Sequence, residues 1–101
     1  MLESVYEAAL CHQLGLLGLS IERKVNVPVM YKGVAVKEPL QLDILAERKV
    51  IVEVKATEKD HSIYESQVLT YLRLTGLRLG LIINFGKDYV KNGMCRVING
   101  Y

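Results

Sequence analysis

The hydrophobic pattern of the chain begins with a helical period. Apolar residues recur three and four positions apart and predict a helix from Leu2 to about Leu17: Leu2, Val5, Tyr6, Ala9, Leu10, Leu14 and Leu17. The pattern then changes to that of strands. Ile21 to Tyr31 is rich in β-branched residues and ends at a Lys32-Gly33 turn, and Val34 to Lys37 and a strand carrying Asp43 follow. We expect a meander of antiparallel strands.

The second half of the chain shows the same change from helical spacing of apolar residues to a strand pattern. After the polar stretch from Thr57 to Ser62, apolar residues at helical spacing predict a helix that ends at Gly76, a suitable C-terminal cap. Leu79 to Phe85 is a nearly continuous apolar run, typical of a strand buried on both faces. Met94 to Ile98 follows as a closing strand, after the turn-forming pair Asn92-Gly93. The pattern predicts a mixed α/β fold with the order helix, three or four strands, helix, two strands.

A polar triplet, Glu47-Arg48-Lys49, separates two strand-like runs in the middle of the chain. A three-residue hairpin loop there pairs Ala46 with Val50 and, three rungs further, Asp43 with Glu53. Side chains alternate with period two. One face then carries Leu42, Ile44, Ala46, Val50, Val52 and Val54, and the other carries Gln41, Asp43, Leu45, Ile51, Glu53 and Lys55. We expect the first face to be core and the second to be apolar only near the turn.

Two carboxylates that face each other across a strand pair repel and destabilise the hairpin. Asp43 and Glu53 therefore need a cation. Lys55 on the same face is one choice, which would make this a solvated surface of compensated charges. A bound divalent metal is the other, and the spacing alone leaves both open.

The two predicted helices each carry a polar pair four residues apart. Glu3 and Glu7 share one face of the first helix, where acidic residues in the first turn also suit the helix dipole. Gln67 and Tyr71 share one face of the second helix, among mostly aliphatic neighbours. A Gln on such a face is either exposed or placed against other polar groups.

Composition narrows the class without naming a function. A length of 101 residues, half of them hydrophobic, suits a single domain spanning the chain. A net charge of +2 permits contact with phosphates but does not indicate it. Cys11 and Cys95 have neither metal-ligand nor disulfide-framework spacing, so we expect two small buried hydrophobes in a reducing compartment. Since no membrane span or leader is visible, we expect a soluble, cytoplasmic protein.

The order of the polar residues resembles the PD-(D/E)XK nuclease superfamily: a helix Glu, then Asp43, then the Glu53-Val54-Lys55 triplet, then Gln67 on the next helix. The match is closer still to the small GxxExxY proteins, whose segments resemble residues 2–10, 67–72 and 80–86. Two positions depart from that pattern. The Gly that opens the signature would fall before Met1, which suggests a shortened N-terminus, and Tyr64 stands where the family has a His.

The resemblance implies a restriction-endonuclease-like core with a central mixed sheet flanked by helices, and a site where the hairpin strands diverge. It implies that Asp43 and Glu53 hold Mg²⁺ or Mn²⁺, with the backbone carbonyl of Val54 as a third ligand. It also implies that Lys55 orients or deprotonates the attacking water. The remaining implied residues are Glu3, which completes the metal shell, Gln67, which positions the water or Lys55, and Tyr71 and Glu7, which support the site.

Three functions follow as alternatives. The preferred one is a metal-dependent nuclease acting on DNA or RNA, because Asp43, Glu53 and Lys55 are all present. The second is a nucleic-acid-binding or assembly module that keeps the fold without turnover, and the modest charge and small size motivate it. The third is a structural or oligomeric module, motivated by the aliphatic strand Leu79 to Ile83. A homodimer suits enzymes that place two sites across a duplex.

Overall fold

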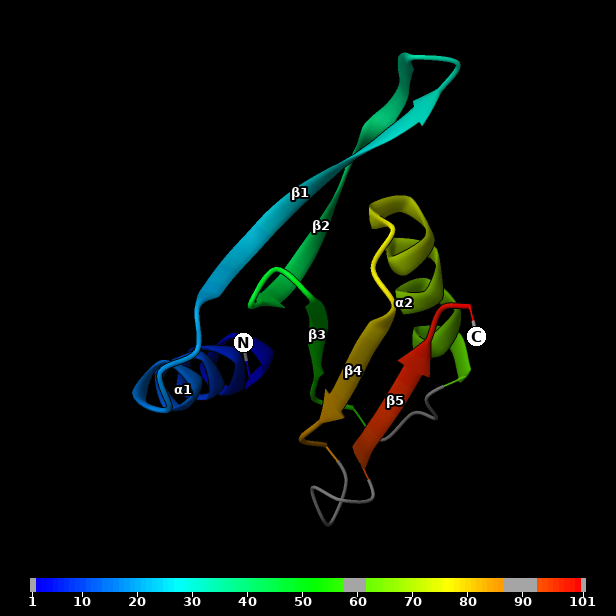
Figure 1. The fold of residues 1–101 in the computed structure, drawn as a ribbon. Helices are drawn as coiled ribbons and strands as arrows, with labels where there is room; N and C mark the ends of the chain where they lie inside the picture. The colour runs from blue at the N-terminus through cyan, green and yellow to red at the C-terminus, as the bar shows by residue number, and fades with distance from the viewer. Residues whose placement is uncertain (1, 58–61, 87–92, 101) are drawn as a thin grey trace.

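A computed structural model describes residues 2–57, 62–86 and 93–100 of the chain (Figure 1). Its elements are α1 (Leu2–Leu16), β1 (Ile21–Tyr31), β2 (Val34–Ala46), β3 (Val50–Lys55), α2 (Ser62–Thr75), β4 (Leu79–Asn84) and β5 (Met94–Ile98). The predicted order and mixed α+β class are confirmed. Most of the predicted polar stretch between Thr57 and Ser62, and the predicted turn residue Asn92, lie outside the described residues.

The main difference from the prediction is the length of β2, since the two strand segments expected on either side of Pro39 form one continuous strand. The pairing with β1 absorbs the proline by shifting register between Val27 and Met30. Proline cannot donate to a ladder and is tolerated at such irregularities. Three strands, not four, therefore precede α2.

The sheet has the strand order β1-β2-β3-β4-β5. The first three strands form the predicted antiparallel meander. The chain then crosses through α2, so that β4 runs parallel to β3, and β5 returns antiparallel to β4. Figure 1 shows the β1–β2 ribbon extending beyond the other strands.

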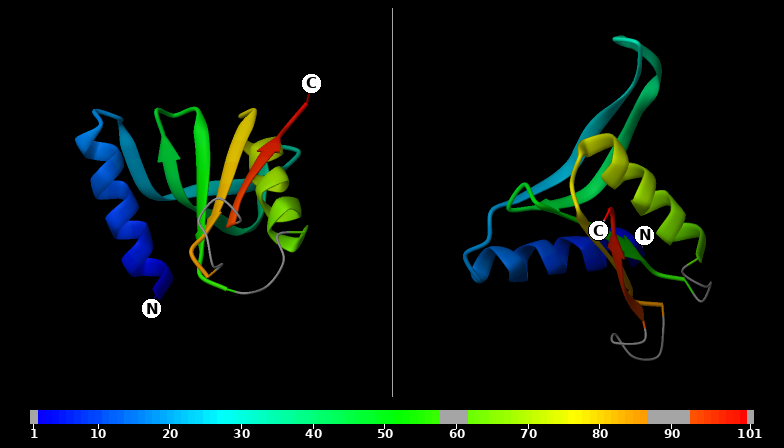
Figure 2. Two further views of the ribbon diagram at one scale, coloured as in Figure 1. Left: turned by 90° about the horizontal axis from the view of Figure 1, so that it is seen from below. Right: turned by 45° about the vertical axis from the view of Figure 1, so that its right-hand side comes forward.

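The two helices cover opposite faces of this sheet (Figure 2). The α2 face holds the larger cluster, in which Val68 and Leu72 of the helix pack against Ile51 and Ile82 of the central strands. On this face α2 approaches β4 closely, because a Cβ placed on Gly80 would lie 2.5 Å from Val68 Cγ1. The glycine is therefore what allows the helix to lie so near the sheet.

The α1 face holds a second cluster of Ile44, Val52, Val54 and Ile83, against which Tyr6 and Leu10 of α1 pack. Tyr6 also stacks on Phe85, just after β4, with ring centroids 4.5 Å apart and an angle of 9° between the planes. This contact fixes the first turns of α1 over the ends of the central strands. It thereby sets the positions of Glu3 and Glu7.

The prediction that Leu42 shares one core face of the hairpin with Ile44 is wrong. Leu42 belongs to the α2-side cluster, whereas Ile44, two residues later on β2, belongs to the α1-side cluster. The β1–β2 ribbon therefore twists between these residues, at the level of Lys24 and Asp43, so that its side chains change from one side of the sheet to the other. Lys24 has a φ of 54° inside a strand, and this left-handed conformation rotates the backbone at a cost of roughly 1–2 kcal/mol.

Candidate active site

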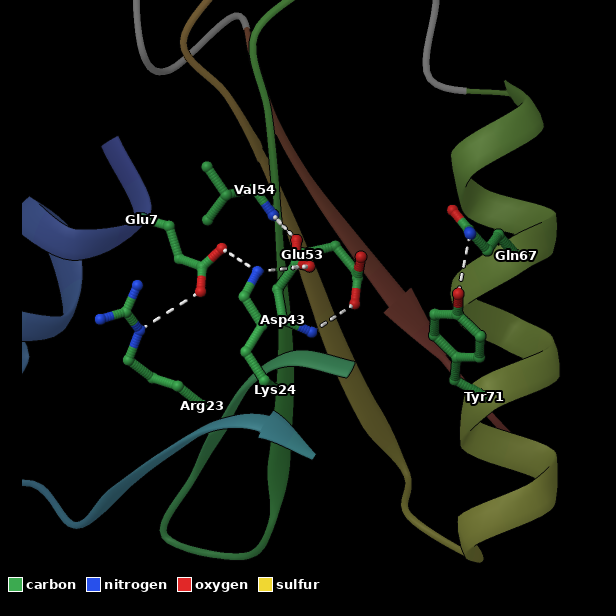
Figure 3. A network of polar contacts seen from close by, with 8 residues as sticks. All are labelled: Glu7, Arg23, Lys24, Asp43, Glu53, Val54, Gln67 and Tyr71. Atoms are coloured by element: carbon green, nitrogen blue, oxygen red, sulfur yellow. Dashed lines mark hydrogen bonds and ion pairs between the residues drawn. The ribbon is translucent and has the colours of Figure 1, made fainter. Parts of the chain in front are cut away.

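The candidate site forms where β2 and β3 separate (Figure 3). The predicted register is confirmed from Ala46–Val50 to Ile44–Val52, where the ladder ends. At the next residue pair, the side-chain carboxylates of Asp43 and Glu53 accept the backbone hydrogen bonds in place of carbonyl oxygens. The amide of Asp43 donates to Glu53 Oε1 at 3.2 Å, and the amide of Val54 donates to Asp43 Oδ2 at 3.0 Å. Two side chains therefore satisfy N–H groups that the diverging strands leave open.

Glu53 is the more buried of the two carboxylates, with 3% of its surface exposed. Burial first, and then the negative charge of Asp43, raise the pKa of Glu53 to about 8, against a smaller lowering by the Asp43 amide and the positive charge of Lys55. Ionising both carboxylates is therefore unfavourable without a cation. A metal ion between them would remove this penalty.

Lys55 lies at the end of β3, two residues after Glu53 and on the same side of the strand. It is half-buried, and its Nζ lies 4.7 Å from the centre of the Tyr64 ring on α2. A cation over an aromatic face is attracted by the ring quadrupole. Tyr64 therefore helps to hold the ammonium beside the carboxylates.

The polar pair predicted on the second helix lies on the site side of α2. Gln67 Nε2 donates to Tyr71 Oη at 2.8 Å, as Figure 3 shows. Tyr71 is 6% exposed, and its pKa is raised by burial first and then by the negative charge of Glu53. The structure thus brings Tyr71 close enough to Glu53 to sense its charge, and Gln67 is bound to Tyr71.

The two glutamates predicted on one face of α1 have different environments. Glu3 is exposed, and its Oε2 accepts a hydrogen bond from the Ala56 amide just beyond β3, at 3.3 Å. Glu7 is 3% exposed and binds two cations of β1, Arg23 at 3.3 Å and Lys24 at 2.9 Å. Glu7 is therefore a buried carboxylate paired with two exposed cations, and Glu3 lies at the rim.

Lys24 is the residue that the sequence analysis missed. Its Nζ lies 4.0 Å from Asp43 Oδ1, so it connects Glu7 on α1 with the carboxylate pair (Figure 3). The charged run Glu22-Arg23-Lys24, in a strand that otherwise has Ile or Val at every second position up to Val29, was a visible signal. It could not be interpreted without knowing that the ribbon twists there.

The donor set fits a small divalent cation. Among residues 2–57, 62–86 and 93–100, no three acidic, His or Cys side chains converge as a ready metal cluster. Asp43 and Glu53 would supply two carboxylates, and the carbonyl of Val54 is one residue away. Mg²⁺ commonly takes one or two carboxylates and keeps several waters, so this set is sufficient.

The other reactive side chains lie apart from this site. Cys11 and Cys95 are free thiols and are half-buried, not fully buried as predicted. Burial and the neighbouring Glu65 carboxylate raise the pKa of Cys95 to about 11, so this thiol is a poor nucleophile at neutral pH. No helix among the described residues is long and apolar enough to cross a membrane.

The solved structures that resemble the chain include two crystal structures. A crystal structure of SSO0001 aligns with a TM-score of 0.72 and 17% identity, covering 99% of this chain and 51% of that one. A crystal structure of an alkaline exonuclease, LHK-Exo, from Laribacter hongkongensis aligns with a TM-score of 0.65 and 12% identity, covering 96% and 56%. The chain therefore spans about half the length of these proteins. The likeness confirms the restriction-endonuclease-like fold.

No curated protein sequence matches the chain. The sequence does match the family profile of the PD-(D/E)XK nuclease superfamily over residues 1–97, nearly its whole length. Members of this superfamily generally use divalent metal ions. The chain belongs to the PD-(D/E)XK nuclease superfamily.

Proposed function

We propose that the protein is a metal-dependent nuclease that hydrolyses phosphodiester bonds of DNA or RNA. The observation that carries the proposal is the meeting of Asp43, Glu53 and Lys55 where β2 and β3 separate. Its membership of the nuclease superfamily supports the same chemistry. Within that superfamily, the segments at residues 2–10, 67–72 and 80–86 favour the GxxExxY proteins.

In this proposal Asp43 and Glu53 hold Mg²⁺ or Mn²⁺, together with the Val54 carbonyl and water. The ion, when bound, polarises the scissile phosphate and lowers the pKa of a bound water. The protein's own part is to aim both carboxylates into one gap. The amide hydrogen bonds from Asp43 and Val54 fix that aim, because each carboxylate gives one oxygen to a backbone donor and keeps the other.

Lys55 is the proposed catalytic cation. As an ammonium held against Tyr64, it orients the attacking water and stabilises the negative charge that grows on the phosphate oxygens. Only as the neutral amine could it take the proton of that water. Gln67, through Tyr71, supports the water or Lys55 from the α2 side. Glu3, at the rim beside Ala56, completes the metal shell directly or through a water, and Glu7 supports the site from α1.

The proposed partner is nucleic acid, and a homodimer that places two sites across a duplex fits the proposal. We expect the protein to act in the cytoplasm. The test uses labelled single- and double-stranded DNA and RNA, with Mg²⁺ or Mn²⁺, and the wild-type chain beside Asp43→Asn. Glu38→Gln, an exposed acid on the β1–β2 ribbon, is the matched control.

Metal-dependent cleavage by the wild type and by Glu38→Gln, lost in Asp43→Asn, supports the proposal. Calorimetric titration of Mn²⁺ into the same proteins separates the remaining outcomes. Binding of Mn²⁺ without cleavage of any substrate favours the nucleic-acid-binding or assembly module. Absence of Mn²⁺ binding in the wild type contradicts the metal site itself.

A further inference from the structure

A second group of charges lies beside the carboxylate pair, on the α1 side. The side chain of Glu7 is 4% exposed, and each of its oxygens faces a different cation: Oε1 lies 3.3 Å from Arg23 Nε and Oε2 lies 2.9 Å from Lys24 Nζ. A buried carboxylate is costly unless it is paired and hydrogen-bonded. Glu7 therefore pairs with Lys24, whose side chain is 49% exposed, in a position next to the candidate metal site.

Lys24 also reaches the carboxylate pair itself. Its Nζ lies 4.0 Å from Asp43 Oδ1, while Asp43 Oδ2 already accepts the hydrogen bond from the Val54 amide. The oxygen that faces the ammonium is thus the one that remains for a metal ion. Two cations cannot share that oxygen at close range without strong repulsion.

The backbone at Lys24 indicates that this placement is built into the fold. Among the described residues, the other non-glycine residues with positive φ are Lys32, Glu47 and Arg48, which lie in hairpin turns. Lys24 alone of these lies inside a paired region, between the Arg23–Ile44 and Val25–Leu42 rungs. Strain of this kind persists where the surroundings enforce it and commonly marks functional sites.

We propose that Lys24 is a tethered counter-cation of the metal site, occupying the space between Glu7 and Asp43 in the metal-free protein and competing with a divalent ion for Asp43. This inference rests on the proposed function. Lys24 keeps its shorter contact with Glu7 when an ion binds, so only the longer contact with Asp43 must be given up. The ammonium therefore compensates Asp43 without metal and weakens metal binding.

The test is a calorimetric titration of Mn²⁺ at fixed pH and salt into the wild type and Lys24→Met. Removal of the competing charge is expected to tighten Mn²⁺ binding by roughly tenfold or more. Lys24→Arg, which keeps the charge, and Lys49→Met, which removes an exposed lysine at the hairpin loop, should stay within about twofold of the wild type. A purely structural role for Lys24 gives the opposite result, weaker binding in Lys24→Met.

Unchanged or weaker binding by Lys24→Met, when the wild type binds and Asp43→Asn does not, overturns the role of Lys24 and leaves the proposed function standing. Absence of Mn²⁺ binding in both the wild type and Lys24→Met overturns the role of Lys24 and the proposed function together. If Lys24→Met fails to fold because Glu7 loses a partner, the double variant Glu7→Gln with Lys24→Met removes both charges. It should bind Mn²⁺ roughly tenfold more tightly than Glu7→Gln alone.

Discussion

The two ends of the β2–β3 hairpin use the same two strands but are held together by different atoms. At the turn end, backbone bonds pair Ala46 with Val50 and Ile44 with Val52, and the fully buried Ile44 and Ile51 fill the cores on the two faces. At the open end, the ladder is replaced by hydrogen bonds to the carboxylates of Asp43 and Glu53.

The difference shows how one hairpin can provide both stability and a site. The turn end gains free energy from apolar burial and complete backbone pairing. At the open end the amides of Asp43 and Val54 are hydrogen-bonded to carboxylates. The same arrangement brings two like charges together, which lowers stability and creates affinity for a cation. Substitutions at the two ends should therefore have separable effects.

The largest expected effect is that of Lys55→Met on cleavage. Loss of a cation that stabilises charge in the transition state should lower the rate by about 10³-fold, or about 4 kcal/mol, in a metal-dependent nuclease assay. Mn²⁺ affinity should not fall, because Lys55 is not a ligand. Lys49→Met, at the turn end of the same hairpin, is the matched control and should cleave normally. Equal losses in the two variants would show that the two ends are not functionally distinct.

The next largest effect is that of Ile51→Ala on folding. Ile51 is fully buried in the α2-side cluster, so its truncation should lower the free energy of unfolding by about 3 kcal/mol in urea denaturation. Ile51→Val should cost about 1 kcal/mol. The Mn²⁺ affinity of the folded variant should match that of the wild type. A large drop in affinity would mean that the turn end also sets the geometry of the open end.

The opposed carboxylates could be predicted from the sequence because they depend on local rules. A three-residue loop fixes the register, and the period of two then brings Asp43 and Glu53 together. The buried strand Leu79–Asn84 and the helix with Gln67 and Tyr71 follow from equally local patterns. These are the parts of the fold and the site in which short-range geometry decides the outcome.

The roles of Lys24 and of the two glutamates depend on long-range packing and could not be predicted in this way. Helical spacing puts Glu3 and Glu7 on one face, but the docking of α1 through Tyr6 and Phe85 decides which of them is buried. Likewise, the faces of the β1–β2 ribbon change sides at Lys24, whose backbone is left-handed. The spacing of apolar residues in the sequence does not indicate this conformation.

A smaller effect is expected from the pH dependence of the open end. The pKa of Glu53 is raised to about 8 in the folded chain, from an ordinary value of 4.5. The folded state therefore binds this proton more tightly than the unfolded state does. Metal-free stability due to this group is full below pH 4.5, falls as the pH rises, and is lost above pH 8.

Glu53→Gln should remove that dependence, because its amide oxygen can still accept from Asp43 but carries no charge. At pH 8 without metal the variant should be more stable than the wild type, measured by thermal or urea unfolding. Mn²⁺ binding by the wild type should strengthen up to about pH 8, since the ligand must lose its proton. A wild type whose metal-free stability rises between pH 5 and 8 relative to Glu53→Gln would contradict this account.

The smallest effect separates the two parts of the open end, the carboxylates and the lysine. Tyr64→Leu removes the ring beneath Lys55 Nζ, an attraction of about 0.5–1 kcal/mol, so cleavage should fall only a few-fold. Tyr64→Phe keeps the ring and should cleave almost like the wild type. Neither variant should change Mn²⁺ affinity, because Tyr64 contacts the ammonium and not the carboxylates. If Tyr64→Phe lost as much activity as Tyr64→Leu, the hydroxyl and not the ring would matter, and the cation–π contact would not be what positions Lys55.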